Sequence, residues 1–211
     1  MTTRPVIPGT DRHRSWGERY ELKLADRFGI WLSSVQIRRR VGSFEGLRVA
    51  DIGCGYEAAF VRSILDEIEH ATIVDLSLSG DLLEHPKLEA RVGLLPETLQ
   101  GIATSSLDVV LCNNVLEHLW KPVETVREVR RMLRPGGSAF FNVPSWRGKF
   151  YLETLAFRLG ITAADEIDDH KAYYDEKELW RLVVEGGFKP KDVLVRRHKF
   201  GLNTFAFCKK S

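Results

Sequence analysis

Long apolar runs are absent from this sequence. No stretch approaches the roughly 18 consecutive apolar residues that a membrane-spanning helix needs. The first residues include Arg4, Asp11 and Arg12, where a secretory signal would have an apolar core. We therefore expect a soluble, cytoplasmic protein without a membrane span.

Cysteine is scarce, with Cys54, Cys112 and Cys208 the only three in 211 residues. An odd number without short pairing fits neither a disulfide framework nor a zinc motif, so we expect reduced thiols. No group of His, Cys and carboxylate residues has the sequence spacing of metal ligands. The sequence therefore predicts that no metal ion is needed.

A strong excess of charge is also missing. Thirty-one Lys and Arg residues stand against 29 Asp and Glu, a net charge of +2. Proteins that bind nucleic acid usually carry a larger basic excess, so charge disfavours that class of partner. The length suits one domain with an elaboration, and both a monomer and a homodimer are compatible with it.

Helical and strand patterns alternate along the chain. Apolar residues at intervals of three and four predict a first helix from Tyr20 to Val35. Short apolar runs predict strands, and further apolar stripes predict helices, at residues 47–52, 61–68, 71–74, 107–112, 123–133, 139–143, 175–185, 192–195 and 204–207. This alternation is typical of a doubly wound α/β fold with a mostly parallel sheet and helices on both faces. The last two strands are close enough in sequence to form an antiparallel edge hairpin.

Turn and cap residues give some of the boundaries. Pro135-Gly136-Gly137 predicts the end of the helix at 123–133. Asp175, followed three residues later by Glu178, predicts an N-terminal cap, and Gly186-Gly187 predicts the end of that helix.

The chain divides into two expected regions. Residues 1–42 are interpreted as a helical cover, and residues 43–211 as the main domain. Within the domain, residues 144–175 are too long for an ordinary loop and are rich in aromatic side chains. We interpret them as a lid-like insertion that shapes an acceptor pocket; the alternative is a helix that only covers the core.

A glycine turn follows the first predicted strand, in Asp51-Ile52-Gly53-Cys54-Gly55. Ligands of open parallel sheets bind beyond the carboxyl ends of the strands, and glycines there let the backbone approach a ligand closely. Asp75 ends the next strand, at the offset where a carboxylate can accept both ribose hydroxyls of an adenine nucleoside. The pattern predicts a nucleotide-like ligand, the alternative being a purely structural turn.

The glycine turn alone leaves two kinds of cofactor open. Gly53, Gly55 and Ala58 also satisfy the dinucleotide fingerprint, so an oxidoreductase that uses a dinucleotide is an alternative. Asp51 counts against it, because that carboxylate would repel a pyrophosphate and attract an ammonium or sulfonium group.

Four segments, in their order and spacing, resemble the class I S-adenosylmethionine-dependent methyltransferases of the small methyltransferase-domain type called type 11. They are Val49–Gly55, Ile73–Asp75, Leu107–Leu119 and Leu133–Gly137. The resemblance implies a Rossmann-like sheet of seven strands, S-adenosyl-L-methionine as cofactor and S-adenosyl-L-homocysteine as product. The family often has an acid after the third strand. Here residues 92–95 offer none, which implies that adenine is either recognised by backbone groups or bound more weakly.

The resemblance also implies roles for single residues. The methionine part of the cofactor would face Asp51, Gly53, Cys54 and Gly55. Asp75 would hold the ribose, and Leu76 would pack near adenine. Asn113 and Asn114 would reach the methionine moiety or the acceptor, with capping of the turn at 116–119 as the alternative for Asn114. Trp16 and Tyr20 would cover the cofactor, unless they pack in the core.

The chemistry expected is methyl transfer to a small-molecule, sugar-linked or lipid-like acceptor at oxygen. A hydroxyl acceptor must lose a proton, and His118 and His170 are the candidate catalytic bases; packing or capping is the structural alternative for each. The Asn-Pro-Pro-Tyr motif of amino-methylating nucleic-acid enzymes is absent after residue 112. An inactive cofactor-binding regulatory or partner protein is the main alternative function, and the oxidoreductase is a more distant one.

Overall fold

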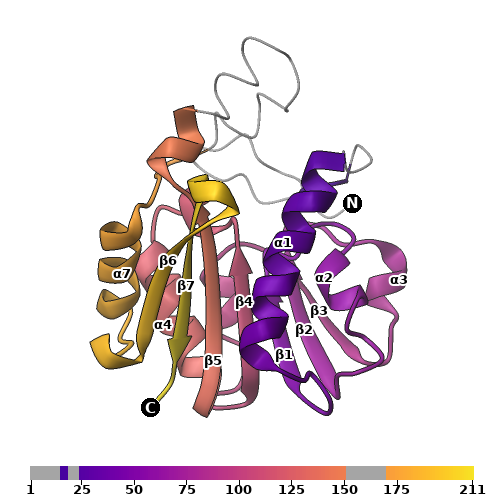
Figure 1. Cartoon of the computed structure of the whole chain (residues 1–211). Helices are drawn as coiled ribbons and strands as arrows, with labels where there is room; N and C mark the ends of the chain where they lie inside the picture. Colours follow the sequence, from indigo (N-terminus) through magenta and orange to yellow (C-terminus); the bar gives the residue numbers. More distant parts are fainter. Residues whose placement is uncertain (1–14, 19–23, 151–169) are drawn as a thin grey trace.

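A seven-stranded sheet forms the centre of the computed structural model, which describes residues 15–18, 24–150 and 170–211 (Figure 1). The strand order is β3-β2-β1-β4-β5-β7-β6. The strands are β1 (Arg48–Ile52), β2 (His70–Asp75), β3 (Leu88–Val92), β4 (Leu107–Asn113), β5 (Leu133–Pro144), β6 (Val193–His198) and β7 (Asn203–Lys209). Neighbouring strands are parallel up to β5, and β7 is antiparallel to both β5 and β6. The predicted α/β class and the antiparallel edge hairpin are confirmed.

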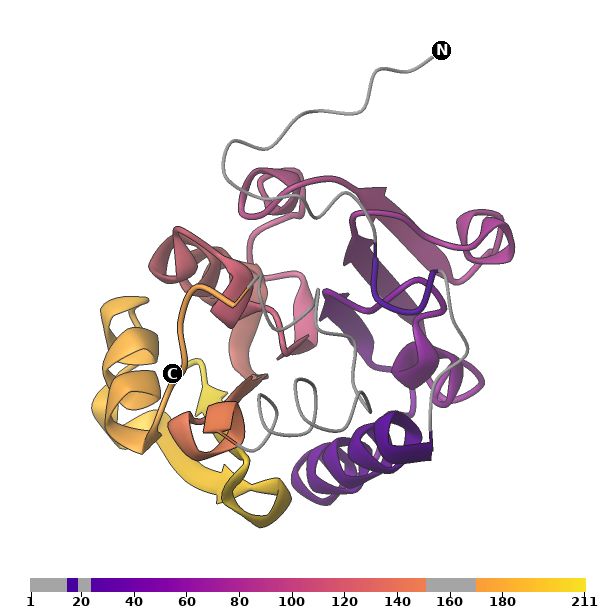
Figure 2. The same ribbon diagram turned by 90° about the horizontal axis from the view of Figure 1, so that it is seen from above.

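Helices cover both faces of this sheet (Figure 2). They are α1 (Leu24–Val41), α2 (Ala59–Arg62), α3 (Gly80–Leu83), α4 (Pro122–Met132) and α7 (Glu176–Glu185). Ile37 of α1 and Val61 of α2 pack in one core layer, which also holds Phe140 of β5. Val129 of α4 and Leu179 of α7 pack in the layer on the opposite face. Alternate residues of the buried strands therefore supply two separate cores. No helix in the described parts of the chain is long and apolar enough to cross a membrane.

The strand order reverses at the boundary between β1 and β4. From β1 the chain adds β2 and β3 on one side of the sheet, and it then crosses to add β4 on the other side of β1. A reversal of this kind opens a crevice beyond the carboxyl ends of the strands, where ligands of open α/β sheets bind. The view in Figure 2 is from above this end of the sheet.

Two segments differ from the prediction, one in the length of a helix and the other in the strand that follows a correctly predicted helix end. The helix predicted at 61–68 is only the short α2, and residues 63–67 form turns, although Ile64 and Ile68 are buried as the pattern indicated. The helix before Pro135-Gly136-Gly137 ends at Met132, and those three residues lie inside β5. Gly136 N donates to Lys210 O, and Lys210 N donates to Gly137 O, so pairing with the chain end draws this turn into the sheet.

Other boundaries agree with the sequence. Asp175 and Glu178 form the predicted capping box of α7, in which Asp175 N donates to Glu178 Oε2 at 2.8 Å. The helix ends at Glu185, directly before the two glycines. The described part of the first helix runs past Val35 to Val41. Most of the predicted lid, residues 151–169, lies outside the described residues.

Candidate functional site

The glycine turn and Asp75 meet at the carboxyl ends of β1 and β2. Gly53 N donates to Val74 O at 2.8 Å, and Gly55 N donates to Asp75 Oδ2 at 2.7 Å. Leu76 N donates to the other carboxylate oxygen, also at 2.7 Å. The structure thus brings together the residues that were predicted to bind most of the cofactor, namely Asp51, Gly53, Cys54, Gly55, Asp75 and Leu76.

Glycine is required at two positions of this turn. Gly53 has φ 72° and Gly55 has φ 76°, a region that residues with a Cβ rarely adopt. A Cβ on Gly53 would lie 2.1 Å from Val115 Cγ2. The turn after β1 therefore packs directly on the loop that follows β4.

Asp51 gives the crevice its charge preference. Its side chain is 4% exposed. Burial, and then the negative charge of Asp75, raise the pKa of Asp51 to about 7. A cationic ligand placed beside these two carboxylates would relieve both effects, so the crevice favours an ammonium or sulfonium group.

Ser15 covers Asp75 from the N-terminal segment, a contact that the sequence did not predict. Its hydroxyl oxygen lies within hydrogen-bond distance of two acceptors, Asp75 Oδ1 and Ser77 O, the latter at 2.6 Å. The next residue, Trp16, accepts a hydrogen bond from Tyr56 N at 2.9 Å through its carbonyl oxygen. Trp16 lies in a turn against the glycine loop, and Tyr20 lies outside the described residues.

The two asparagines after β4 have different surroundings. Asn113 Oδ1 is buried and has no hydrogen-bond partner within the described ranges, so it can accept from a ligand. Asn114 Oδ1 accepts from the side chains of Asn142 and Asn203, each at 3.2 Å. The turn η2 (Leu116–His118) has Val115 at its N-cap and no side-chain cap, so the capping role considered for Asn114 is wrong.

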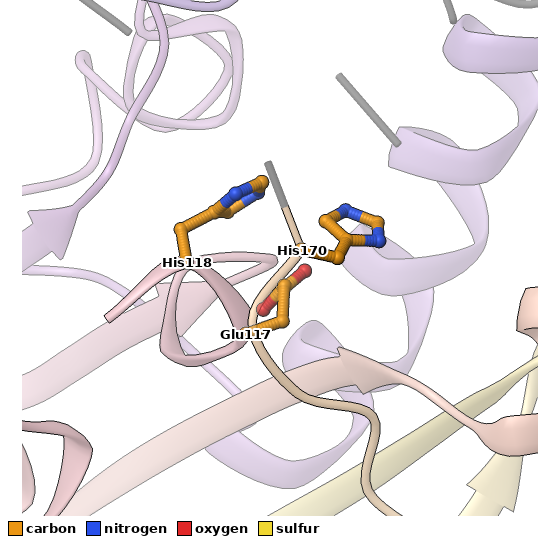
Figure 3. A group of neighbouring side chains, drawn as sticks. All are labelled: Glu117, His118 and His170. Atoms are coloured by element: carbon orange, nitrogen blue, oxygen red, sulfur yellow. The ribbon is translucent and has the colours of Figure 1, made fainter. Parts of the chain in front are cut away.

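His118 and His170 lie together, and the side chain of Glu117 lies beside them (Figure 3). The two imidazole rings are 4.7 Å apart between centroids. Glu117 O accepts from Lys171 N at 2.7 Å and from Ala172 N at 3.2 Å, which holds the chain after His170 against η2. The sequence predicted both histidines near the acceptor, but it gave no sign that they touch and did not identify Glu117.

An open cavity of about 450 Å³ adjoins His170. The other residues that line it are Trp146, Lys149, Lys171, Ala172, Tyr173, Tyr174 and Glu178. Trp146 and Tyr173 stand with ring centroids 5.5 Å apart, and Lys149 Nζ lies within 5.5 Å of both rings. His170 Nδ1 is 3.0 Å from the Tyr173 hydroxyl. The cavity therefore offers aromatic walls and a cation beside the histidine pair.

Comparison with known proteins gives one consistent family. Residues 50–141 match the model of a family described as a methyltransferase domain. The chain is 29% identical to a ubiquinone biosynthesis O-methyltransferase of Escherichia fergusonii, and the match covers 94% of this chain and 87% of that protein. It is 30% identical to a protein of the same name from Escherichia coli, and that match covers 79% of this chain and 70% of the relative.

Solved structures agree on the fold. A S-adenosylmethionine-dependent methyltransferase of Archaeoglobus fulgidus matches with a TM-score of 0.61 and 17% identity, covering 89% of this chain and 100% of that one. A second match, with a TM-score of 0.64 and 16% identity, is phosphoethanolamine N-methyltransferase 2 of Haemonchus contortus in complex with S-adenosyl-L-methionine. It covers 85% of this chain and 52% of that one. This chain belongs to the class I S-adenosyl-L-methionine-dependent methyltransferases, in the type 11 methyltransferase-domain family, and is an enzyme that uses that cofactor.

Proposed function

We propose that the enzyme transfers the methyl group of S-adenosyl-L-methionine to a hydroxyl oxygen of a small acceptor with an aromatic ring. The observation that carries this proposal is the His118–His170 pair beside a cavity walled by Trp146 and Tyr173. Aromatic walls suit a flat apolar ring, and polar side chains at one end suit a hydroxyl. The names of the bacterial relatives, which are O-methyltransferases, support oxygen as the methylated atom.

The cofactor would lie across the carboxyl ends of β1, β2 and β4. In this arrangement Asp75 binds the ribose hydroxyls and Leu76 packs against adenine. Asp51 and the backbone of Gly53, Cys54 and Gly55 face the methionine part. Supporting this arrangement, Asn113 Oδ1 is a buried acceptor without a partner in the described chain, well suited to the ammonium group.

Methyl transfer of this kind depends mainly on alignment. The bond between the methyl carbon and the sulfonium sulfur breaks as the bond from the acceptor oxygen to that carbon forms, and S-adenosyl-L-homocysteine leaves. The hydroxyl proton must leave as well, and an imidazole of the His118–His170 pair or a water beside it accepts that proton. The side chains of His118 and His170 would hold the acceptor hydroxyl in line with the methyl group. His118 lies just beyond the carboxyl end of β4, at the same edge of the sheet as Asn113.

An acceptor panel tests the proposal. The enzyme and S-adenosyl-L-methionine labelled with ¹³C in the methyl group are mixed with a phenol, a catechol, a sugar, an amine or a carboxylic acid, and the products are identified by NMR. We expect methoxy signals from the aromatic hydroxyls. Methylation confined to the amine or the acid would contradict the proposal, and an enzyme that binds the cofactor but modifies no acceptor would favour the regulatory alternative.

The histidine pair is tested with the same assay. His118→Ala should lower kcat by about 10²–10⁴-fold on the preferred hydroxyl, with S-adenosyl-L-homocysteine affinity nearly unchanged. His85→Ala, on the loop between α3 and β3, is the matched control and should retain the rate of the parent enzyme. Equal rates for all three proteins would remove the pair from the mechanism.

A further inference from the structure

We infer that Glu117, His118 and His170 bind one divalent transition-metal ion. Each of the three side chains offers one ligand atom, and these atoms lie within 4.8 Å of one another. Figure 3 shows the carboxylate of Glu117 close to the ring of His170, with the ring of His118 facing the same space. The sequence predicted no metal because His170 is far along the chain from the adjacent Glu117 and His118, and it is the fold that places the three together.

The donor set indicates which ions fit. Two imidazoles and one carboxylate form the three-ligand set of catalytic zinc sites and of non-haem iron sites. Magnesium and calcium prefer sites built from oxygen atoms alone, so they match this set less well. Zinc, cobalt, manganese or ferrous iron is therefore the class of ion expected.

The local structure favours these residues as ligands. Glu117 is 1% exposed, and carboxylates at such depth are usually paired with cations or coordinate metals. The hydrogen bonds from Lys171 N and Ala172 N to Glu117 O fix the backbone on both sides of the site. Bonds of about 2.0–2.1 Å to a tetrahedral ion place ligand atoms about 3.3 Å apart, so the side chains need only rotate inward by a short distance.

Three protein ligands leave at least one coordination position open. The function assigned to that position rests on the proposed O-methylation, whereas binding of the ion does not. An ion there would supply Lewis-acid chemistry, so that an acceptor hydroxyl held at that position would lose its proton to water more readily during methyl transfer. In this account His118 and His170 act as ligands that hold the acceptor oxygen, instead of the bases that the sequence suggested.

Metal binding is measured directly on the full chain after treatment with a chelator. Titration with Zn²⁺ by calorimetry should give one ion per chain. Titration with Co²⁺ should give the visible absorption bands of a site with nitrogen and oxygen ligands. Glu117→Gln and His170→Ala should each weaken Zn²⁺ affinity at least tenfold, while His85→Ala should bind as the parent chain does.

Two controls make the result decisive. Each variant is first shown to be folded by its affinity for S-adenosyl-L-homocysteine, which the metal ligands are not expected to contact. Absence of saturable Zn²⁺ and Co²⁺ binding at micromolar concentrations, or variants that bind as well as the parent chain, would overturn the inference. O-methylation that persists in the metal-free enzyme would leave the proposed function intact. A bound ion without O-methylation would leave the metal site intact.

Discussion

Asp51 is a residue whose burial should lower the stability of the ligand-free chain. Its pKa is raised from 3.8 to about 7 in the folded chain by burial and by Asp75. Between about pH 4 and pH 7, the carboxyl group of Asp51 is therefore protonated in the folded state and ionised in the unfolded state. Stability of the ligand-free protein should fall as pH rises through this window, and a cationic cofactor should reverse the loss.

Replacement of Asp51 by asparagine tests this account. Asp51→Asn removes the ionising group, so the decrease in unfolding free energy between pH 5 and pH 8 should become smaller than in the parent chain. The same change should weaken S-adenosyl-L-methionine binding at pH 8. Urea unfolding at the two pH values and calorimetry measure both effects. An unchanged pH dependence in the folded variant would show that Asp51 is not the group responsible.

Single residues differ in whether the sequence predicts their contacts in the fold. The glycine turn and Asp75 were predictable because strand ends, glycines and a carboxylate at a fixed offset are local patterns. Ser15 on Asp75 and Glu117 beside His170 were not. Those contacts join segments distant in the chain, and no spacing in the sequence records them.

At the scale of elements, strand β4 carries different functions at its two ends. Its carboxyl end leads to Asn113 and η2, whereas its amino end holds Asp108, which is 8% exposed. Asp108 Oδ2 accepts from Arg48 N at 2.7 Å, and its other oxygen contacts Arg134. Asp108 lies in a segment that resembles the family, and these contacts tie β4 to β1 and to the turn within β5.

We predict that Asp108→Ala lowers the free energy of unfolding by about 1–3 kcal/mol, because the partly buried hydrogen bond from Arg48 N and the contact with Arg134 are both lost. Affinity for S-adenosyl-L-homocysteine should stay the same, since the site lies at the other end of the strand. Chemical denaturation and calorimetry give the two values. Asp66→Ala, at an exposed position, serves as the control for loss of a carboxylate. A large loss of cofactor affinity would place Asp108 in the binding site instead.

The capping box of α7 gives a second prediction at this scale. Asp175→Ala should cost about 0.5–2 kcal/mol of stability, the range measured for loss of an N-cap side chain. Glu176→Ala, in the first turn of the same helix, is a suitable comparison because it leaves the box intact. Equal unfolding midpoints for Asp175→Ala and the parent chain would show that the cap contributes nothing.

Strands and caps were easier to predict than helix lengths. Buried strands appear as uninterrupted apolar runs, which made β1, β2 and β4 recognisable. Helix α2 is shorter than the helix that the apolar spacing predicted. Ile64 and Ile68 are buried from the segment after α2, and apolar spacing reports burial whether or not the backbone is helical. The Pro-Gly-Gly segment joined β5 through backbone pairing with the chain end, which is a property of the tertiary structure.

For the whole molecule, the fold brings the candidate groups to the same edge of the sheet. The ends of β1 and β2 provide Asp51, the glycine turn and Asp75, and the end of β4 provides Asn113 and the turn that holds His118. The segment after residue 169 adds His170 and leads to the aromatic cavity. A parallel sheet produces this gathering because all its carboxyl ends point the same way.

Binding of S-adenosyl-L-homocysteine to the parent chain and to Asp75→Ala, measured by calorimetry, tests this arrangement most directly. We expect saturable binding to the parent chain and no comparable binding of NAD. In the variant, affinity for S-adenosyl-L-homocysteine should be weaker by about 1–3 kcal/mol, the scale of lost charged hydrogen bonds. Equal affinity of the parent chain and a folded Asp75→Ala protein would contradict the placement of the cofactor at the carboxyl ends of β1 and β2.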